Sequence, residues 1–284
     1  MWKLDFFILP SRNYKGIDVD EAYEFGERIE YLEKKERVYI PEEFYNILDQ
    51  KNITAFDFLY GSEQNDLSDY LLEIISKQKT CHDTYAELNG RTEYGYLPIS
   101  EKDISAEALT ISVVNIKDVK NDKSVQVNDI IRIKRFYLGK TDNYKIFENR
   151  VKDCFPDIVF HNDAFKYIEK LGKCADVVEE LIRHLTVLND VGKRTYSYYN
   201  KNEKEVLAEF KAGYNIECSG KGSNEEKSYN KDIVYNDKKF QLTCNPHTKL
   251  YKKRTDQRIY FCWGRDEIEN HNIIVVRMGD HWQE

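Results

Sequence analysis

The segment Ile273-Ile274-Val275-Val276-Arg277-Met278 places the strictest limit on how this chain folds. Side chains alternate between the two faces of a strand, and here both faces are apolar until Arg277. A strand of this kind needs neighbours, so we expect it to lie inside a sheet and not at its edge. Three more strand-like segments precede it, and their spacing predicts an antiparallel meander: 239–243, 248–252 and 257–263.

Helical periodicity comes before these strands. Between Ala175 and Leu188 the apolar residues recur three and four positions apart, which predicts an amphipathic helix. Shorter helices are expected at 163–171 and 203–211. In the strand at 258–263, Ile259, Phe261 and Trp263 share one face by alternation, and we expect that face to pack on the helices around residues 165–188. The opposite face carries Arg258, Tyr260 and Cys262.

The N-terminal part has a different pattern. A strand is predicted at 3–9, and β-branched runs predict further strands at 109–116 and 126–137. Helices are predicted at 18–35, 41–49 and 67–76. The whole chain is therefore predicted to be α+β. An acidic, α/β-mixed domain at 1–150 is followed by a domain at 151–284, in which a helical segment precedes a small antiparallel sheet.

Charge is distributed unevenly along the 284 residues. Residues 1–79 hold 17 acidic and 10 basic side chains, whereas residues 239–258 hold 6 basic side chains and one acidic one. Opposite charges at the two ends suggest different partners. We expect the acidic domain to bind a protein partner or inhibitor and the basic segment to bind RNA.

Several classes of protein are disfavoured. No apolar run approaches the ~18 residues that a membrane span needs, so no membrane partner is expected. The six cysteines have no paired spacing, which favours a reducing, cytoplasmic environment. Cys244 and His247 have a C-x-x-H spacing, with Cys218 and Cys262 elsewhere, but no second close pair completes a zinc set. We therefore predict no metal or other cofactor, although a metal at Cys218, Cys244 and His247 stays open.

The C-terminal region resembles the RelE/ParE toxin superfamily. The resemblance rests on Lys249-Leu250-Tyr251, on Gln257-Arg258-Ile259-Tyr260-Phe261, and on the stretch from Ile273 to His281. It implies two helices before an antiparallel sheet. It also implies a toxin-like, metal-independent endoribonuclease or RNA-binding component of a bacterial defence or toxin–antitoxin system, acting on RNA that includes ribosome-associated RNA. The N-terminal region and a long polar insertion before the sheet depart from a minimal toxin.

Cleavage of RNA by its own 2′-hydroxyl defines the side chains that such a site needs. These are a base, cations for the phosphate and an acid for the leaving oxygen. We predict that Lys249 and Arg258 clamp the phosphate, with Tyr260 orienting it or donating a proton. His281 or His247 is the candidate base, because imidazole titrates near neutral pH. The remaining candidates are Arg277 in the catalytic set and, as RNA contacts, Lys239, Lys252, Lys253 and Arg254.

Each candidate also has a purely structural interpretation. Arg258 on a strand can be a surface partner across the sheet, and the basic run at 252–254 can be a solvated hairpin tip. Arg277 and His281 can close the end of the sheet against Asp280. Two other functions therefore stay open: a non-enzymatic module that binds protein or nucleic acid, and a metal-dependent DNA nuclease.

Overall fold

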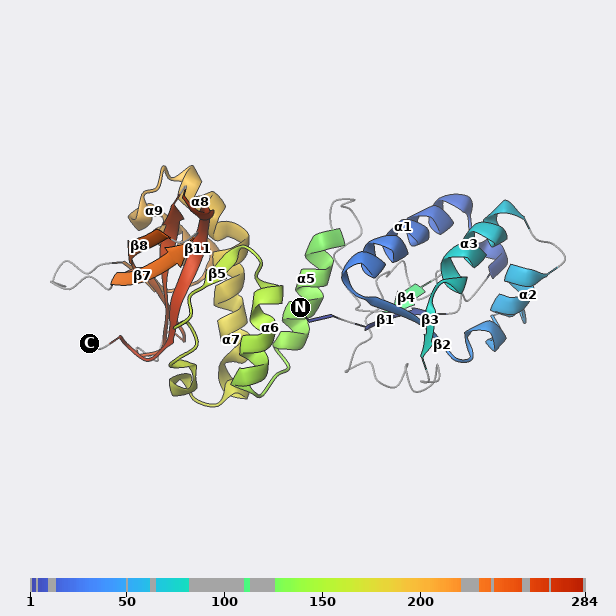
Figure 1. Ribbon diagram of the computed structural model, residues 1–284, viewed down its shortest axis with the longest axis horizontal. Coiled ribbons are helices and arrows are strands. Elements are labelled where there is room, and N and C mark those ends of the chain that lie inside the picture. The colour runs from blue at the N-terminus through green and yellow to red at the C-terminus, as the bar shows by residue number, and fades with distance from the viewer. Residues whose placement is uncertain are drawn as a thin grey trace. The chain divides into compact units, whose positions relative to one another are not determined.

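A computed structural model of the chain describes residues 2–3, 5–9, 14–49, 51–61, 65–81, 110–112, 126–220, 230–235, 238–251, 256–265 and 267–282. The protein is α+β, and it divides into two compact units at residues 129 and 130 (Figure 1). The domain boundary expected at residue 150 falls inside helix α6, Tyr144–Cys154, which belongs to the C-terminal unit. No helix in the described ranges is long and apolar enough to cross a bilayer.

The N-terminal unit is built on a four-stranded sheet with the order β3-β2-β1-β4. Strands β1 (Asp5–Leu9), β2 (Arg37–Pro41) and β3 (Lys79–Cys81) run parallel, and β4 (Thr110–Ser112) is antiparallel to β1. Helix α1, Val19–Lys35, buries its predicted apolar stripe, which confirms the period of the sequence: Ala22, Phe25, Ile29 and Leu32. The other elements are the 3₁₀ turns Tyr14–Gly16 and Phe44–Asn46 and the helices α2 (Ala55–Tyr60) and α3 (Asp66–Ser76).

Two predictions for this half of the chain are wrong. The helix expected at 41–49 is only the turn Phe44–Asn46, because Pro41 is the last residue of β2. The strand expected at 126–137 is helix α5, Gln126–Leu138. Its β-branched residues favoured a strand locally, but Ile130, Lys134 and Leu138 are buried at a spacing of four residues. The part of the expected strand 109–116 that follows Ser112 lies outside the described residues.

The C-terminal unit has a five-stranded sheet with the order β5-β11-β10-β9-β6. Strand β11 (Ile268–Gly279) lies between β5 and β10, which confirms that it is an interior strand. It runs parallel to β5 (Ile158–Phe160) and antiparallel to β10 (Arg258–Arg265). Strands β9 (His247–Lys249) and β6 (Cys218–Ser219) continue the antiparallel pairing, so the predicted meander is confirmed for β9, β10 and β11.

The expected strand at 239–243 exists but has a different neighbour. As β8, Lys238–Thr243, it pairs with β7, Asn230–Tyr235, in a separate two-stranded ribbon. The ribbon packs its apolar residues on one face of the large sheet, where Ile233 and Leu242 meet Tyr260 and Cys262. Strand β8 therefore covers one face of the large sheet and is not one of its strands.

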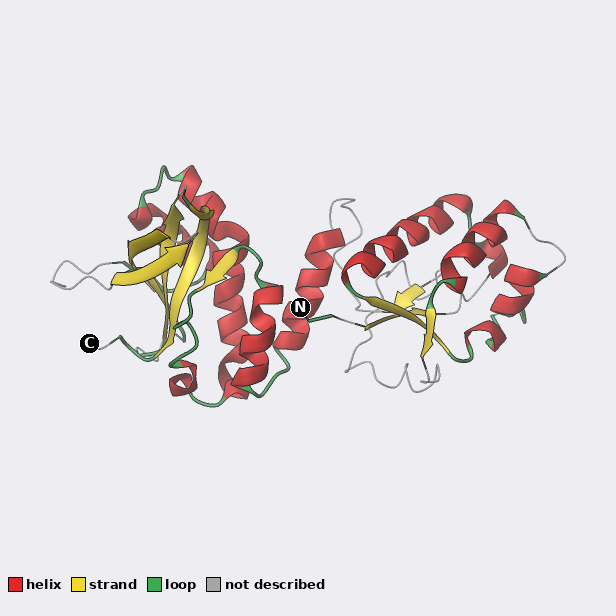
Figure 2. Ribbon diagram, viewed as in Figure 1, coloured by secondary structure: helices red, strands yellow, loops and turns green. Residues whose placement is uncertain are grey.

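Helices cover the opposite face (Figure 2). They are α7 (Cys174–Val187), which continues through a π-helical turn at Leu188–Gly192 into α8 (Lys193–Tyr198), and α9 (Glu203–Tyr214). Trp263 of β10 stacks on Tyr196 of α8 at 4.2 Å between ring centroids. The predicted apolar face therefore packs on helices, although this contact lies beyond residues 165–188. The helix expected at 163–171 is only the 3₁₀ turn Ile168–Leu171.

Candidate nucleic-acid interface

The register of the sheet brings the predicted site residues into two adjacent rows. In the first row Lys249 of β9 lies opposite Arg258 of β10, which lies opposite Gly279 of β11. In the second row His247, Tyr260 and Arg277 are paired in the same way. Residues opposite one another in antiparallel strands share a face, and so do residues two apart. The sheet therefore brings together four of the five predicted catalytic residues: Lys249, Arg258, Tyr260 and Arg277. His247, the alternative candidate base, lies on the same face.

Arg258 is buried although its guanidinium is charged. Only 9% of its surface is exposed. Its Nε and Nη1 atoms are buried and have no hydrogen-bond partner in the described part of the chain. Leaving one buried donor unpaired costs about 1–3 kcal/mol. This burial differs from the solvated surface arginine of the structural interpretation, and it leaves donors for an anion.

Arg277 has partners of its own. Its exposed fraction is 6%, and Nη2 donates to Asp280 Oδ1 at 2.6 Å. Its guanidinium lies 3.8 Å from the centroid of the Tyr167 ring. Asp280 is the partner that the structural interpretation of Arg277 anticipated. Nε of Arg277 is buried and has no hydrogen-bond partner among the described residues, so one donor remains here as well.

Tyr260 lies beneath the surface of this face. It is 0% exposed, and its hydroxyl oxygen accepts a hydrogen bond of 3.1 Å from the backbone N–H of Trp282. Its ring lies 5.0 Å from the His247 ring and 5.4 Å from the Trp282 ring. Tyr260 therefore holds the C-terminal segment against the sheet and positions its neighbours. A direct contact with a substrate would require the Trp282 segment to move.

His247 is oriented by the backbone. Its Nδ1 lies 3.0 Å from the carbonyl oxygen of Asn245, a contact in which the ring donates. A neutral imidazole then carries its lone pair on Nε2, the form that a general base needs. His247 is nevertheless only 7% exposed. His281, the other candidate base, is partly exposed and stands between Asp280 and Trp282.

The predicted RNA contacts are less clustered. Lys239 lies on the two-stranded ribbon, where its Nζ pairs with Asp232 at 2.7 Å. It is therefore not part of the two rows. Lys252, Lys253 and Arg254 lie outside the described residues.

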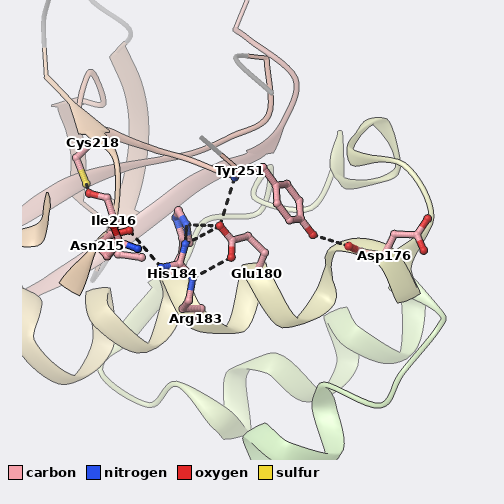
Figure 3. A network of polar contacts seen from close by, with 8 residues as sticks. All are labelled: Asp176, Glu180, Arg183, His184, Asn215, Ile216, Cys218 and Tyr251. Atoms are coloured by element: carbon pink, nitrogen blue, oxygen red, sulfur yellow. Dashed lines mark hydrogen bonds and ion pairs between the residues drawn. The ribbon is translucent and has the colours of Figure 1, made fainter. Parts of the chain in front are cut away.

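A polar network that the sequence analysis missed holds the end of β9 (Figure 3). Oε1 of Glu180 on α7 accepts hydrogen bonds from the backbone N–H of Tyr251 at 3.3 Å and from Arg183 Nη2 at 2.7 Å. The same oxygen lies 3.1 Å from Nε2 of His184. The Tyr251 hydroxyl donates to the backbone carbonyl of Asp176. Because Tyr251 comes two residues after Lys249, this network fixes the strand end that carries the first row.

The network has a defined charge state. Burial opposes ionisation of Glu180, but hydrogen bonds from His184 and Arg183 outweigh it and lower the pKa of that carboxyl. Burial lowers the pKa of His184 despite its contact with Glu180. A neutral His184 donating to an ionised Glu180 satisfies both. The spacing of four residues between Glu180 and His184 on a predicted helix was the sequence signal for this pair.

Among the described residues no group of three or more His, Cys, Asp or Glu side chains is arranged to hold a metal ion. A hydrogen bond with Cys244, together with burial, raises the pKa of Cys262, so this thiol stays protonated. Burial raises the pKa of Cys218 to about 12.

Comparison of the chain with protein-family models, curated proteins and solved structures found no match. Function must therefore be inferred from the two rows and their surroundings.

Proposed function

We propose that the C-terminal unit binds RNA by its phosphates and cleaves it without a metal ion, as a toxin-like endoribonuclease of a bacterial defence or toxin–antitoxin system. The observation that carries this proposal is Arg258, a buried guanidinium with two donors that have no partner in the described ranges. A phosphate oxygen would satisfy such donors with charge-assisted hydrogen bonds, which are roughly twice as strong as neutral ones.

The neighbouring cations support a phosphate in particular. Lys249 stands directly opposite Arg258, and Arg277 lies one row further along the same face. Arginine recognises the oxygens of a phosphate through its planar fork of donors, and lysine adds a compact charge. Together they can stabilise the extra negative charge of a pentacoordinate phosphorus in the transition state.

RNA supplies its own nucleophile, so the protein needs only proton transfer beside these cations. In the proposed reaction His247 Nε2 removes the proton of the 2′-hydroxyl, and the 2′-oxygen attacks the adjacent phosphorus. The bond to the 5′-oxygen breaks, and His281 protonates the leaving oxygen. The products are a 2′,3′-cyclic phosphate and a 5′-hydroxyl, and both imidazoles then return to their starting protonation states by exchange with water.

The experiment incubates the full-length protein with an end-labelled single-stranded RNA in EDTA and identifies the product ends. We expect cyclic-phosphate ends from the unaltered protein. His247→Gln should abolish cleavage and change the Kd for a 2′-O-methyl copy of the RNA less than threefold, on the order of 0.6 kcal/mol. Arg258→Met should weaken binding itself. Arg194→Met, which removes an exposed cation from α8, is the matched control.

Two outcomes would redirect the proposal. If RNA binding depends on Arg258 but no cleavage occurs, the non-enzymatic module is favoured. The full burial of Tyr260 also supports that alternative. Cleavage of DNA that EDTA abolishes would favour a metal-dependent nuclease. If Arg258→Met and Arg194→Met bind RNA equally strongly, the proposed phosphate role of Arg258 is wrong.

We also propose a protein partner for the acidic N-terminal unit, and co-purification with that unit's partner would test it.

A further inference from the structure

At the β11 end of the first row, Gly279 leaves room for an aromatic residue on the face of the sheet. Gly279 lies opposite Arg258, and a Cβ atom at Gly279 would come within 2.8 Å of both the Cβ and the carbonyl oxygen of Tyr167. Real Cβ atoms essentially never approach other atoms so closely, so the missing side chain makes room for Tyr167. Tyr167 therefore packs closely on β11 at the residue that pairs with Arg258.

From Tyr167 onward, cations and rings alternate. Lys170 Nζ lies 5.3 Å from the Tyr167 ring centroid, and the Arg277 guanidinium lies 3.8 Å from it. Arg277 is also 5.7 Å from the Trp282 ring, and Lys231 Nζ is 5.4 Å from that ring. We call this series the cation–aromatic ladder: Lys170, Tyr167, Arg277, Trp282 and Lys231. Its members come from the turn after β5, from β11 with the segment that follows it, and from β7.

The ladder keeps an excess of positive charge. Asp280 pairs with Lys170 at 3.0 Å and with Arg277 at 2.6 Å, and Asp163 pairs with Lys231 at 2.7 Å. Lys166, at 5.5 Å from the Tyr167 ring, adds a fourth cation to these two carboxylates. An ammonium group has three donors, so one ion pair leaves others for a ligand. Lys170 keeps 54% of its side chain exposed.

We propose that this ladder is a second phosphate-binding track, along which a single strand of RNA runs after its scissile phosphate is held at Arg258. The inference rests on the proposed function and defines its substrate as a single strand that extends beyond the cleaved bond. Grooves that bind single strands combine cations that follow the backbone with aromatic side chains. The aromatic spacers distinguish such a track from a simple acidic-peptide site, where rings between the cations have no role.

The test measures the affinity of the full-length protein for a 2′-O-methyl RNA, which cannot be cleaved, over a range of salt concentrations. The Lys170→Gln/Lys231→Gln double variant removes two ladder cations. The slope of log K against log salt should become shallower by about 1.4, since each phosphate contact on a single strand contributes about 0.7. Lys204→Gln/Arg194→Gln, which removes two exposed cations from α9 and α8, should leave the slope unchanged.

A variant with the opposite expected sign guards against misfolding. Asp280→Asn removes a competing carboxylate and should tighten RNA binding severalfold, a gain that a damaged fold cannot produce. Inorganic phosphate tests Arg258 separately. It should protect the unaltered protein and the ladder variant against unfolding more strongly than it protects Arg258→Met. Equal salt slopes for the ladder variant and its control would overturn the ladder. Equal or stronger binding of a polyglutamate peptide would overturn it in favour of an acidic protein partner.

Failure of the proposed function gives a different pattern. If Arg258 holds no phosphate, inorganic phosphate will stabilise the unaltered protein and Arg258→Met equally, while the ladder variant still changes the salt slope for RNA. If only the ladder is wrong, phosphate will stabilise the protein through Arg258 and the slope will not respond to Lys170 and Lys231.

Discussion

Replacing Arg258 by methionine should make the C-terminal unit more stable while it abolishes phosphate binding. Methionine keeps an unbranched apolar stem of similar shape but carries no donors. The guanidinium in the unbound protein has two buried N–H groups without hydrogen-bond partners in the described part of the chain. Each such group costs about 1–3 kcal/mol, and one end of the side chain retains some contact with water. We therefore expect the free energy of unfolding to rise by about 1–3 kcal/mol.

The matched variant is Arg277→Met on the neighbouring strand. This arginine is as deeply buried, but it donates to Asp280 and packs on Tyr167. Losing a charge-assisted hydrogen bond and a cation–π contact should lower the free energy of unfolding by about 1–3 kcal/mol. Two buried arginines on one face of one sheet should therefore respond to the same substitution with opposite signs.

Urea unfolding followed by tryptophan fluorescence measures both effects. The chain has three tryptophans, and in a Trp2→Phe background the remaining two, Trp263 and Trp282, both report on the C-terminal unit. Phosphate at ten times its Kd should stabilise the Arg258 protein by about 1.4 kcal/mol and leave Arg258→Met unchanged. If Arg258→Met is destabilised as much as Arg277→Met, the donors of Arg258 are satisfied in the folded protein and the inferred anion site is wrong.

Three further substitutions test the surroundings of the site. Glu180→Ala should lower the free energy of unfolding by about 2–4 kcal/mol in urea, because it strands the Tyr251 N–H and a buried His184 donor, whereas the exposed neighbour in Glu179→Ala should change it by less than about 0.5 kcal/mol. The lowered pKa values of His184 and Glu180 make the folded state bind fewer protons than the unfolded state. The contribution of this pair to stability should therefore be fully present above pH about 6.5. It should decline below that pH, where the unfolded state protonates His184 more readily, and decline further below about pH 4.3, where the unfolded state protonates Glu180 more readily. In a pH series of melting temperatures, Glu180→Gln should flatten the second decline. Gly279→Ala should destabilise the unit by about 1–3 kcal/mol and weaken RNA binding, since its Cβ would displace Tyr167; an unchanged melting temperature would contradict the close approach.

Periodicity correctly predicted the elements whose buried residues follow from the spacing within one continuous segment. The stripe of α1 and the doubly apolar β11 are of this kind, because each buries the residues that its own spacing marks. The strand prediction for 126–137 is wrong because β-branched side chains favour a strand only where tertiary packing also favours one. Here tertiary contacts favour helix α5. The position of β8 depended on a face of the large sheet being available, which no local pattern records.

The candidate site shows the same division. Alternation along β10 placed Arg258 and Tyr260 on one face, and the sheet register agrees. The burial of Tyr260 could not be predicted from the sequence, because it comes from the β7–β8 ribbon and from Trp282. The role of Glu180 was hidden for a related reason, since its partner Tyr251 belongs to another part of the chain.

The pairing of β5 with β11 has a consequence for how this protein is made. Strand β11 is translated after every other strand of its sheet, yet it occupies an interior position between β5 and β10. During synthesis neither of those strands has its central neighbour, and Arg277 and Gly279 are absent from the two rows. The two rows can therefore be completed only after β11 has been made. If the rows hold phosphate as proposed, their affinity for it arises only when β11 inserts between β5 and β10.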